Sequence, residues 1–139
     1  MNRGQLRQLA EDRILDAERL LTGGRWSGAY YLAGYAVECG LKACILAYVE
    51  AEGAILQDKK FSEKCWTHDL EDLLALANLT PALDNEAAAN TVFSSNWATA
   101  TQWKETSRYQ LKTRAEADTM YDAVANATNG VLPWIRIRW

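Results

Sequence analysis

Two arginines and a tyrosine in the C-terminal third of the sequence could bind a phosphate group. Arg108 is followed directly by Tyr109, and Arg114 comes shortly after them. Arginine offers phosphate two parallel N–H donors but cannot act as a base, because its pKa exceeds about 12. The ring of Tyr109 could either stack on a nucleobase or pack against the protein. The two arginines therefore predict a phosphate- or nucleic-acid-binding surface.

His68 is the only histidine in the sequence, so it is the only imidazole available as an acid or base near neutral pH. It follows Thr67 at the expected start of a helix, where the helix dipole disfavours a positive charge. We expect a structural or surface role, and a catalytic role only if folding brings His68 close to Arg108. Cys65 and His68 have the spacing of half a zinc site, but two further ligands are missing. We therefore expect no metal and no cofactor.

Glu38 and Lys42 place a carboxylate one helical turn before an ammonium, on a face that also carries Tyr31 and Tyr35. At this spacing the two charges can form an ion pair. If the face is buried, each charge needs a partner, since an isolated ion in the interior is very costly. We expect a structural ion pair. A functional carboxylate at Glu38 is the alternative, because catalytic sites also hold partly buried charges.

Residues 25–52 must position Glu38, and their pattern predicts one long central helix. They contain no proline and follow a Gly23-Gly24 break. Small residues recur every three or four positions, which lines one side of the helix and lets a neighbouring backbone come close. These small residues are Ala29, Ala33, Ala36, Gly40, Ala43 and Ala47. A second, larger apolar stripe makes the helix apolar on most sides, so it should lie in the middle of a bundle.

The N-terminal half supplies the neighbours of that helix. Apolar residues at helical spacing over 6–21 predict a first helix, which the short connection should place antiparallel to the central one. Residues 53–66 have no clear period, and we expect a loop with at most one helical turn. Thr67 then has the character of an N-cap for a short third helix over 67–79.

The C-terminal half should complete an all-α fold. Pro81, after Thr80, predicts a fourth helix running towards Phe93. Residues 97–113 should hold an exposed helix end and then a loop containing Arg108. A last helix should begin near Arg114, with a kink or restart at Pro133. The sequence thus predicts an antiparallel up-and-down helical bundle of four long helices, with a possible short fifth.

The totals describe one ordinary globular domain over 1–139. Hydrophobic residues make up 49% of the chain and charged residues 24%, which argues against disorder. A net charge of -3 gives no overall electrostatic case for nucleic acid, although a local basic patch remains compatible with it. Three cysteines, no apolar leader and a longest uncharged run of only 26–37 in the central helix favour a reducing, cytoplasmic location and no membrane span.

The tryptophans near the C-terminus allow two interpretations. Trp97, Trp103 and Trp134 are interleaved with arginines and could form an aromatic, cationic surface for single-stranded nucleic acid. Tryptophans at helix ends more often cover a core or anchor a protein interface. We favour packing and dimer contacts.

Several stretches resemble the HEPN family of all-helical proteins, which occur in prokaryotes and higher eukaryotes. They are GRWSGAYYLAGYAVECGLKA at 24–43, THDLEDLL at 67–74, WKETSRY at 103–109 and the terminal LPWIRIRW. The resemblance implies a compact helical bundle, commonly a homodimer, that acts on RNA or a nucleotide in toxin–antitoxin and related systems. It also implies a nucleotidyltransferase-like protein as a partner.

Many members of that family resemble metal-independent ribonucleases in which roughly four to six residues separate an arginine from a following histidine. Counting from Arg108, those positions hold Thr113, Arg114 and Ala115 here, so the pattern is incomplete. We therefore favour a catalytically degenerate binding or regulatory module. The alternatives are a ribonuclease centred on Arg108, and a domain that only assembles with another protein. In such a ribonuclease the assisting residues would be Tyr109, Glu38 or His68.

Overall fold

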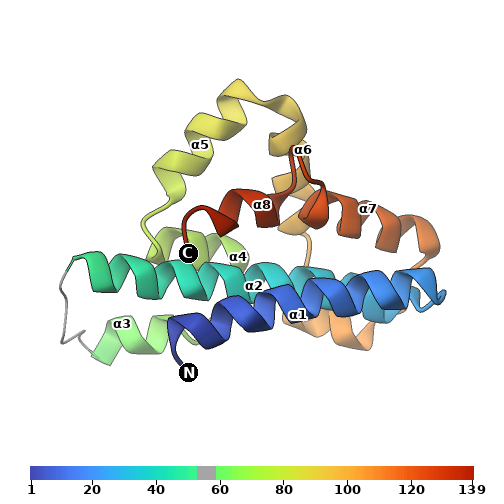
Figure 1. The fold of residues 1–139 in the computed structure, drawn as a ribbon, viewed down its shortest axis with the longest axis horizontal. Coiled ribbons are helices and arrows are strands. Elements are labelled where there is room, and N and C mark those ends of the chain that lie inside the picture. Colours follow the sequence, from blue (N-terminus) through green and yellow to red (C-terminus); the bar gives the residue numbers. More distant parts are fainter. Residues whose placement is uncertain (53–58) are drawn as a thin grey trace.

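The protein is all-helical. A computed structural model describes residues 1–52 and 59–139, and within these ranges it contains eight α-helices, one 3-10 helix and no β-strand (Figure 1). This confirms the predicted all-α class. The loop expected over 53–66 falls partly on 53–58, which lie outside the described residues; the rest of it contains the short helix α3 (Lys59–Lys64).

Helices α1 (Arg3–Thr22) and α2 (Trp26–Ala51) form an antiparallel pair, as their short connection predicts (Figure 1). Gly24 adopts a φ of 75°, a left-handed conformation that glycine reaches without strain, and the chain reverses there. An ion pair of 3.1 Å between Arg3 and Glu50 joins the start of α1 to the end of α2. The predicted bounds of both helices are correct to within a few residues.

The small-residue stripe of α2 is covered by other parts of the same chain. Ala29, Ala33, Ala36, Gly40 and Ala43 are all buried. A Cβ atom on Gly40 would lie 3.0 Å from the side chain of Ile135, which belongs to α8 (Val131–Arg136). These five positions therefore form an internal packing surface that is not free to meet a second subunit, and only Ala47, at the end of the stripe, is half-buried.

A second close approach on α2 holds the segment that carries Arg108. The indole of Trp103 is fully buried and lies against Gly34, where a Cβ atom would come within 2.1 Å of its ring. Its Nε1 donates a hydrogen bond of 3.0 Å to the backbone carbonyl of Tyr31. The 3-10 helix η1 (Glu105–Tyr109) begins two residues later, so Trp103 anchors it to α2.

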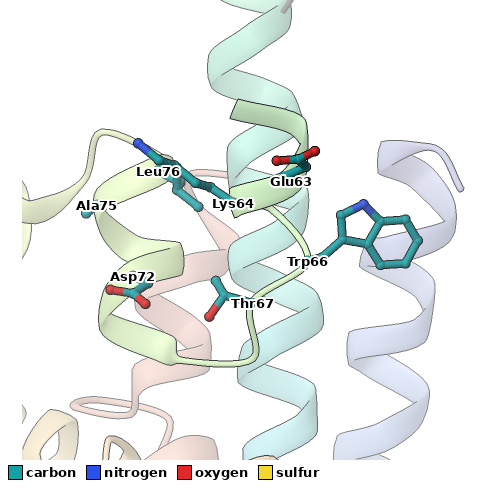
Figure 2. Close-up of a pocket in the computed structure, with 7 residues that line it drawn as sticks. All are labelled: Glu63, Lys64, Trp66, Thr67, Asp72, Ala75 and Leu76. Atoms are coloured by element: carbon teal, nitrogen blue, oxygen red, sulfur yellow. The ribbon is translucent and has the colours of Figure 1, made fainter. Parts of the chain in front are cut away.

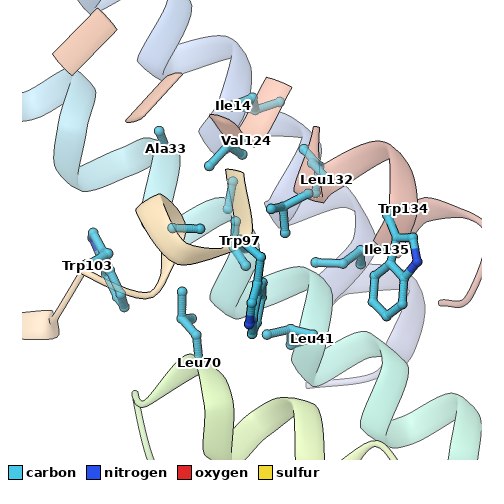
Figure 3. Packing of buried hydrophobic residues seen from close by; sticks show 14 of the residues in the cluster. Ile14, Ala33, Leu41, Leu70, Trp97, Trp103, Val124, Leu132, Trp134 and Ile135 are labelled. Carbon is cyan, nitrogen blue, oxygen red and sulfur yellow. The ribbon is translucent and has the colours of Figure 1, made fainter. Parts of the chain in front are cut away.

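Trp97, Trp103 and Trp134 all pack into the core, where Figure 3 shows them among aliphatic side chains from several helices. The Trp134 ring lies 5.6 Å from that of Phe93, centroid to centroid. The predicted packing role of these three tryptophans is confirmed, and they do not form an exposed aromatic surface; the predicted dimer contacts stay a prediction.

Helix α4 (Leu70–Leu76) starts later than predicted. Its N-cap is Asp69, whose side chain accepts hydrogen bonds from the amides of Glu71 and Asp72. Thr67 instead uses its hydroxyl to accept from the Asp69 amide, at 3.1 Å. The prediction that Thr67 caps the helix is wrong, because a carboxylate two residues further on satisfies the free amides.

The predicted fourth helix is two helices. Helix α5 (Thr80–Ala89) ends at Asn90, and α6 (Thr91–Ala100) starts there. The Asn90 side chain accepts from the Phe93 amide, so it caps the new helix, and it also donates to Asn129 at 2.8 Å. This tertiary contact fixes the break at Asn90 and was not readable from the local sequence.

The last part of the chain restarts as predicted near Pro133. Helix α7 (Arg114–Ala125) begins with a capping box between Thr113 and Glu116, and α8 follows after a short connection. Pro133 lies in the first turn of α8, where a missing N–H removes no helical hydrogen bond. The break itself falls before Pro133, between the two helices.

Among the described residues, α2 is the one helix that is long and apolar enough to cross a membrane. Its most apolar window is 61% buried inside the structure, as expected of a central core helix. The sequence argument against a membrane span used only the uncharged run 26–37, whereas the whole of α2 has 26 residues. The length of the helix therefore does not exclude a membrane span. The burial of α2 explains its hydropathy.

Candidate functional site

Five polar side chains from α2, the start of α4 and η1 form one connected group, which we call the His68 cluster. Its members are Glu38, Lys42, His68, Glu105 and Arg108. The His68 ring is at its centre: Nδ1 lies 3.0 Å from Glu38 Oε1, and Nε2 lies 3.3 Å from Glu105 Oε2. The other oxygen of Glu105, Oε1, lies 3.4 Å from the Arg108 guanidinium. In the folded protein the carboxylate of Glu105 thus bridges His68 and Arg108.

Glu38 is the buried end of this cluster, with 2% of its surface exposed. Its Oε1 accepts a hydrogen bond of 2.8 Å from Lys42 Nζ as well as the contact with His68. Its Oε2 is buried and has no hydrogen-bond partner in the described part of the chain. The predicted Glu38–Lys42 ion pair is confirmed, but Glu38 also orients the imidazole.

The contacts of His68 determine where its protons lie. Because Glu38 Oε1 can only accept, Nδ1 carries a hydrogen. Nε2 faces Glu105 Oε2 at 3.3 Å, and the two groups attract each other when the imidazole is charged. This assignment follows from the network of partners. The His68–Glu105 pair therefore places an imidazole nitrogen beside a carboxylate oxygen.

The residues next to His68 and Glu105 in the sequence also form an ion pair. Asp69 accepts a hydrogen bond of 2.9 Å from Lys104 Nζ. This bond, together with the helix amides of Asp72 and Glu71, lowers the pKa of the Asp69 carboxyl. Residues 68 and 69 thus pair with residues 105 and 104. The N-terminus of α4 is tied to η1 at two adjacent points, which fixes His68 against Glu105.

Arg108 forms the exposed end of the cluster, with 46% of its side chain accessible. Burial raises the pKa of the nearby Tyr31 hydroxyl, and the positive charge of Arg108 opposes that shift. The Cζ atom of Arg108 lies over the Tyr109 ring at 4.9 Å from the centroid. The Tyr31 ring in turn stacks on Tyr35, with centroids 6.1 Å apart. Aromatic groups therefore surround an arginine that faces solvent.

The structure joins four of the predicted site residues and leaves one outside. Glu38, His68, Arg108 and Tyr109 lie together. Arg114 does not share their contacts: it pairs with Asp118 at 3.5 Å and lies over the Trp26 ring at 5.6 Å. The prediction that Arg114 binds phosphate together with Arg108 finds no support in this geometry.

Two details of the cluster differ from the sequence prediction. His68 was expected in the first turn of a helix, which is wrong, because it precedes the N-cap Asp69. Glu105 was missed, although it holds the cluster together. Its spacing of three residues from Arg108 was a usable signal for an ion pair on a short helix.

The protein also has an open hollow next to α3 and α4, shown in Figure 2. It is lined by Glu63, Lys64, Trp66, Thr67, Asp72, Ala75 and Leu76. No member of the His68 cluster lines it. Within the described residues, no three His, Cys, Asp or Glu side chains are grouped so that they could hold a metal ion.

Searches of protein-family models, curated proteins and solved structures give no match to this chain. Its function must therefore be inferred from the chemistry of the His68 cluster.

Proposed function

We propose that this protein is a HEPN-like ribonuclease that binds the backbone of single-stranded RNA at the His68 cluster and cleaves it without a metal. The observation that carries the proposal is the bridge by Glu105, which joins His68 Nε2 to the Arg108 guanidinium. An imidazole, a carboxylate and an arginine that reach one another can supply an acid, a base and a phosphate-binding group. No histidine follows Arg108 at the expected spacing, and in this proposal His68 takes its place.

The proposed reaction is attack of a ribose 2'-oxygen on the adjacent phosphorus. Glu105 takes the proton of the 2'-hydroxyl, and protonated His68 gives its Nε2 proton to the 5'-oxygen as the P–O bond to it breaks. The products are a 2',3'-cyclic phosphate and a free 5'-hydroxyl, and the net charge is unchanged. Arg108 stabilises the charge on the phosphate oxygens. Each proton transfer of this kind contributes about 10²–10⁴-fold.

Glu38 has a positioning role in this proposal. Its carboxylate accepts from Nδ1, which directs Nε2 of the same ring towards Glu105 and Arg108. Because Glu38 is buried, water does not compete with His68 for its carboxylate, and the orientation of the ring is maintained. The arrangement is that of a carboxylate holding an acid–base histidine in one tautomer.

The wider setting of the proposal comes from the family resemblance. We infer that α1, α2, α6 and α7 are the long helices of an antiparallel HEPN-like bundle. A homodimer, a nucleotidyltransferase-like partner and a place in a cytoplasmic toxin–antitoxin system go with that inference. A coprecipitated partner protein and the mass of the complex in solution would test these parts separately from catalysis.

A second candidate is the degenerate binding or regulatory module favoured by the sequence alone. One observation supports it: Glu105 already contacts both His68 and Arg108, so a bound phosphate must displace or share that carboxylate. A module of this kind would bind RNA or a nucleotide through Arg108 and leave it intact.

The two functions are separated by incubating purified protein with end-labelled single-stranded RNA in EDTA. The ribonuclease predicts cleavage that is lost in Arg108→Ala and reduced at least about 100-fold in His68→Ala. Arg114→Ala is the matched control, because Arg114 is an arginine outside the cluster. Intact RNA that is nevertheless bound would favour the binding module, and cleavage that persists in Arg108→Ala would contradict both assignments of the site.

A further inference from the structure

We infer that the exposed ring of Tyr109 is a stacking platform for an unpaired nucleobase next to the phosphate held by Arg108. This inference rests on the proposed function and deepens it, because it adds a binding site for the base to the site proposed for the RNA backbone. From the sequence, Tyr109 was equally compatible with packing against the protein. The structure distinguishes these two roles.

Tyr109 does not pack into the core. Its residue surface is 77% exposed, even though the Arg108 guanidinium lies over the ring at 4.9 Å from its centroid. A flat ring with a cation near it and this much exposed surface keeps room for a second planar group. Burying a tyrosine would have been favourable, so its exposure here needs a local cause.

The cause is the way η1 is attached. Trp103 is anchored under α2, and Ser107 is buried, with its hydroxyl accepting from the Lys104 amide at 3.1 Å. These inward-facing groups leave Arg108 and Tyr109 on the outer side of a short helix. The chain then leaves in an extended conformation at Gln110, so no following element covers the ring.

The position of the ring matches the chemistry of a nucleotide. In a nucleotide only the ribose separates the phosphate from the base. When Arg108 binds the phosphate, the base can therefore reach the Tyr109 ring beside the guanidinium. Stacking on tyrosine requires a base face that is free, which an unpaired nucleotide offers and a duplex does not. Arginine beside the ring adds a cation–π contribution. The site therefore selects single strands by stacking, and it shows little preference among the four bases.

The test measures Kd by fluorescence anisotropy with labelled 2'-O-methyl RNA, whose blocked 2'-oxygen prevents cleavage. A matched oligomer with abasic sugars has the same phosphates and no bases. Tyr109→Ala is expected to weaken binding of the RNA by about 5- to 150-fold and to leave binding of the abasic oligomer unchanged. Tyr109→Phe keeps the ring and is expected to bind as the wild type does.

Trp66→Ala is the matched control, because Trp66 is another aromatic residue with 79% of its surface exposed and lies outside the cluster. It is expected to bind both oligomers normally. Equal weakening of both oligomers by Tyr109→Ala would overturn the stacking role, because the effect would then act through Arg108. RNA binding that is lost in Arg108→Ala and kept in Tyr109→Ala would overturn stacking alone. Wild-type protein that binds neither oligomer would overturn stacking and the proposed function together.

Discussion

Replacing Gly34 by alanine should loosen η1 from α2, because this glycine makes room for the indole of Trp103. A Cβ atom at position 34 would lie 2.1 Å from Trp103 Cδ1, 2.2 Å from Cγ and 2.5 Å from Nε1. Ordinary contacts between such atoms are about 3.5–4.0 Å. The ring must therefore move by more than an ångström, in a place where it is fully buried.

The expected loss of stability follows from three effects. Forcing an extra methyl group into a packed core costs about 1–3 kcal/mol. A displaced indole also weakens its hydrogen bond to the Tyr31 carbonyl, worth about 0.5–1.5 kcal/mol. Alanine recovers up to about 1 kcal/mol through its better helix propensity. We expect Gly34→Ala to lower the free energy of unfolding by roughly 1–4 kcal/mol.

The assay is urea unfolding followed by circular dichroism, with Gly28→Ala as the matched control in the same helix. A Cβ atom at Gly28 would meet only the flexible end of Leu20, at 3.1 Å. That variant should be as stable as the wild type or more stable by up to about 1 kcal/mol. If Gly34→Ala proved as stable as Gly28→Ala, the anchoring of η1 by Trp103 would be refuted.

Three further predictions concern Asp69, Glu38 and the two buried cysteines. Asp69→Ala should cost about 0.5–2 kcal/mol in urea unfolding at pH 7, and Asp69→Asn less, because asparagine still caps α4. The pKa of Asp69 is lowered in the folded state, so the wild type should be more stable than Asp69→Asn above the unfolded-state pKa of about 3.9. This difference in stability should vanish as the pH falls through the folded-state pKa. A difference that does not change with pH would contradict this. Glu38→Gln should destabilise the protein by about 1–3 kcal/mol. This is less than the cost of breaking a fully buried ion pair, because Lys42 can reach water. Adding Lys42→Met should restore part of the lost stability in the same assay. Burial raises the pKa of Cys39 to about 11 and of Cys44 to about 12, so iodoacetamide at pH 8 should label both only after unfolding, and mass spectrometry showing rapid native labelling would argue against their burial.

The central elements could be predicted because their signals are local. The Gly23-Gly24 break marks the end of α1, and the long apolar pattern marks α2. The spacing of four residues between Glu38 and Lys42 was enough to predict their ion pair. The errors occurred where distant residues decide. Asn90 starts a new helix while bonded to Asn129, which no local pattern reveals.

The candidate site shows the same division. Arg108 and Tyr109 were identified by residue type, and His68 was considered because it is the only imidazole. Their meeting depends on how α4 and η1 dock on α2, which the linear spacing does not encode. Glu105 was missed because its role exists only between two segments that are far apart in sequence. A pattern search for an arginine followed by a histidine would fail on this chain, although the fold brings the two residues near each other.

The paired contacts of residues 68 and 69 with residues 105 and 104 have a consequence for how the site can be adjusted. Lys104 never touches the imidazole, yet it holds the neighbouring residue of the same backbone. Removing the charge of this exposed lysine would weaken its bond to Asp69 and so loosen the segment that holds His68 beside Glu105. Modification of one surface amine can therefore change how firmly a partly exposed histidine is held against a carboxylate.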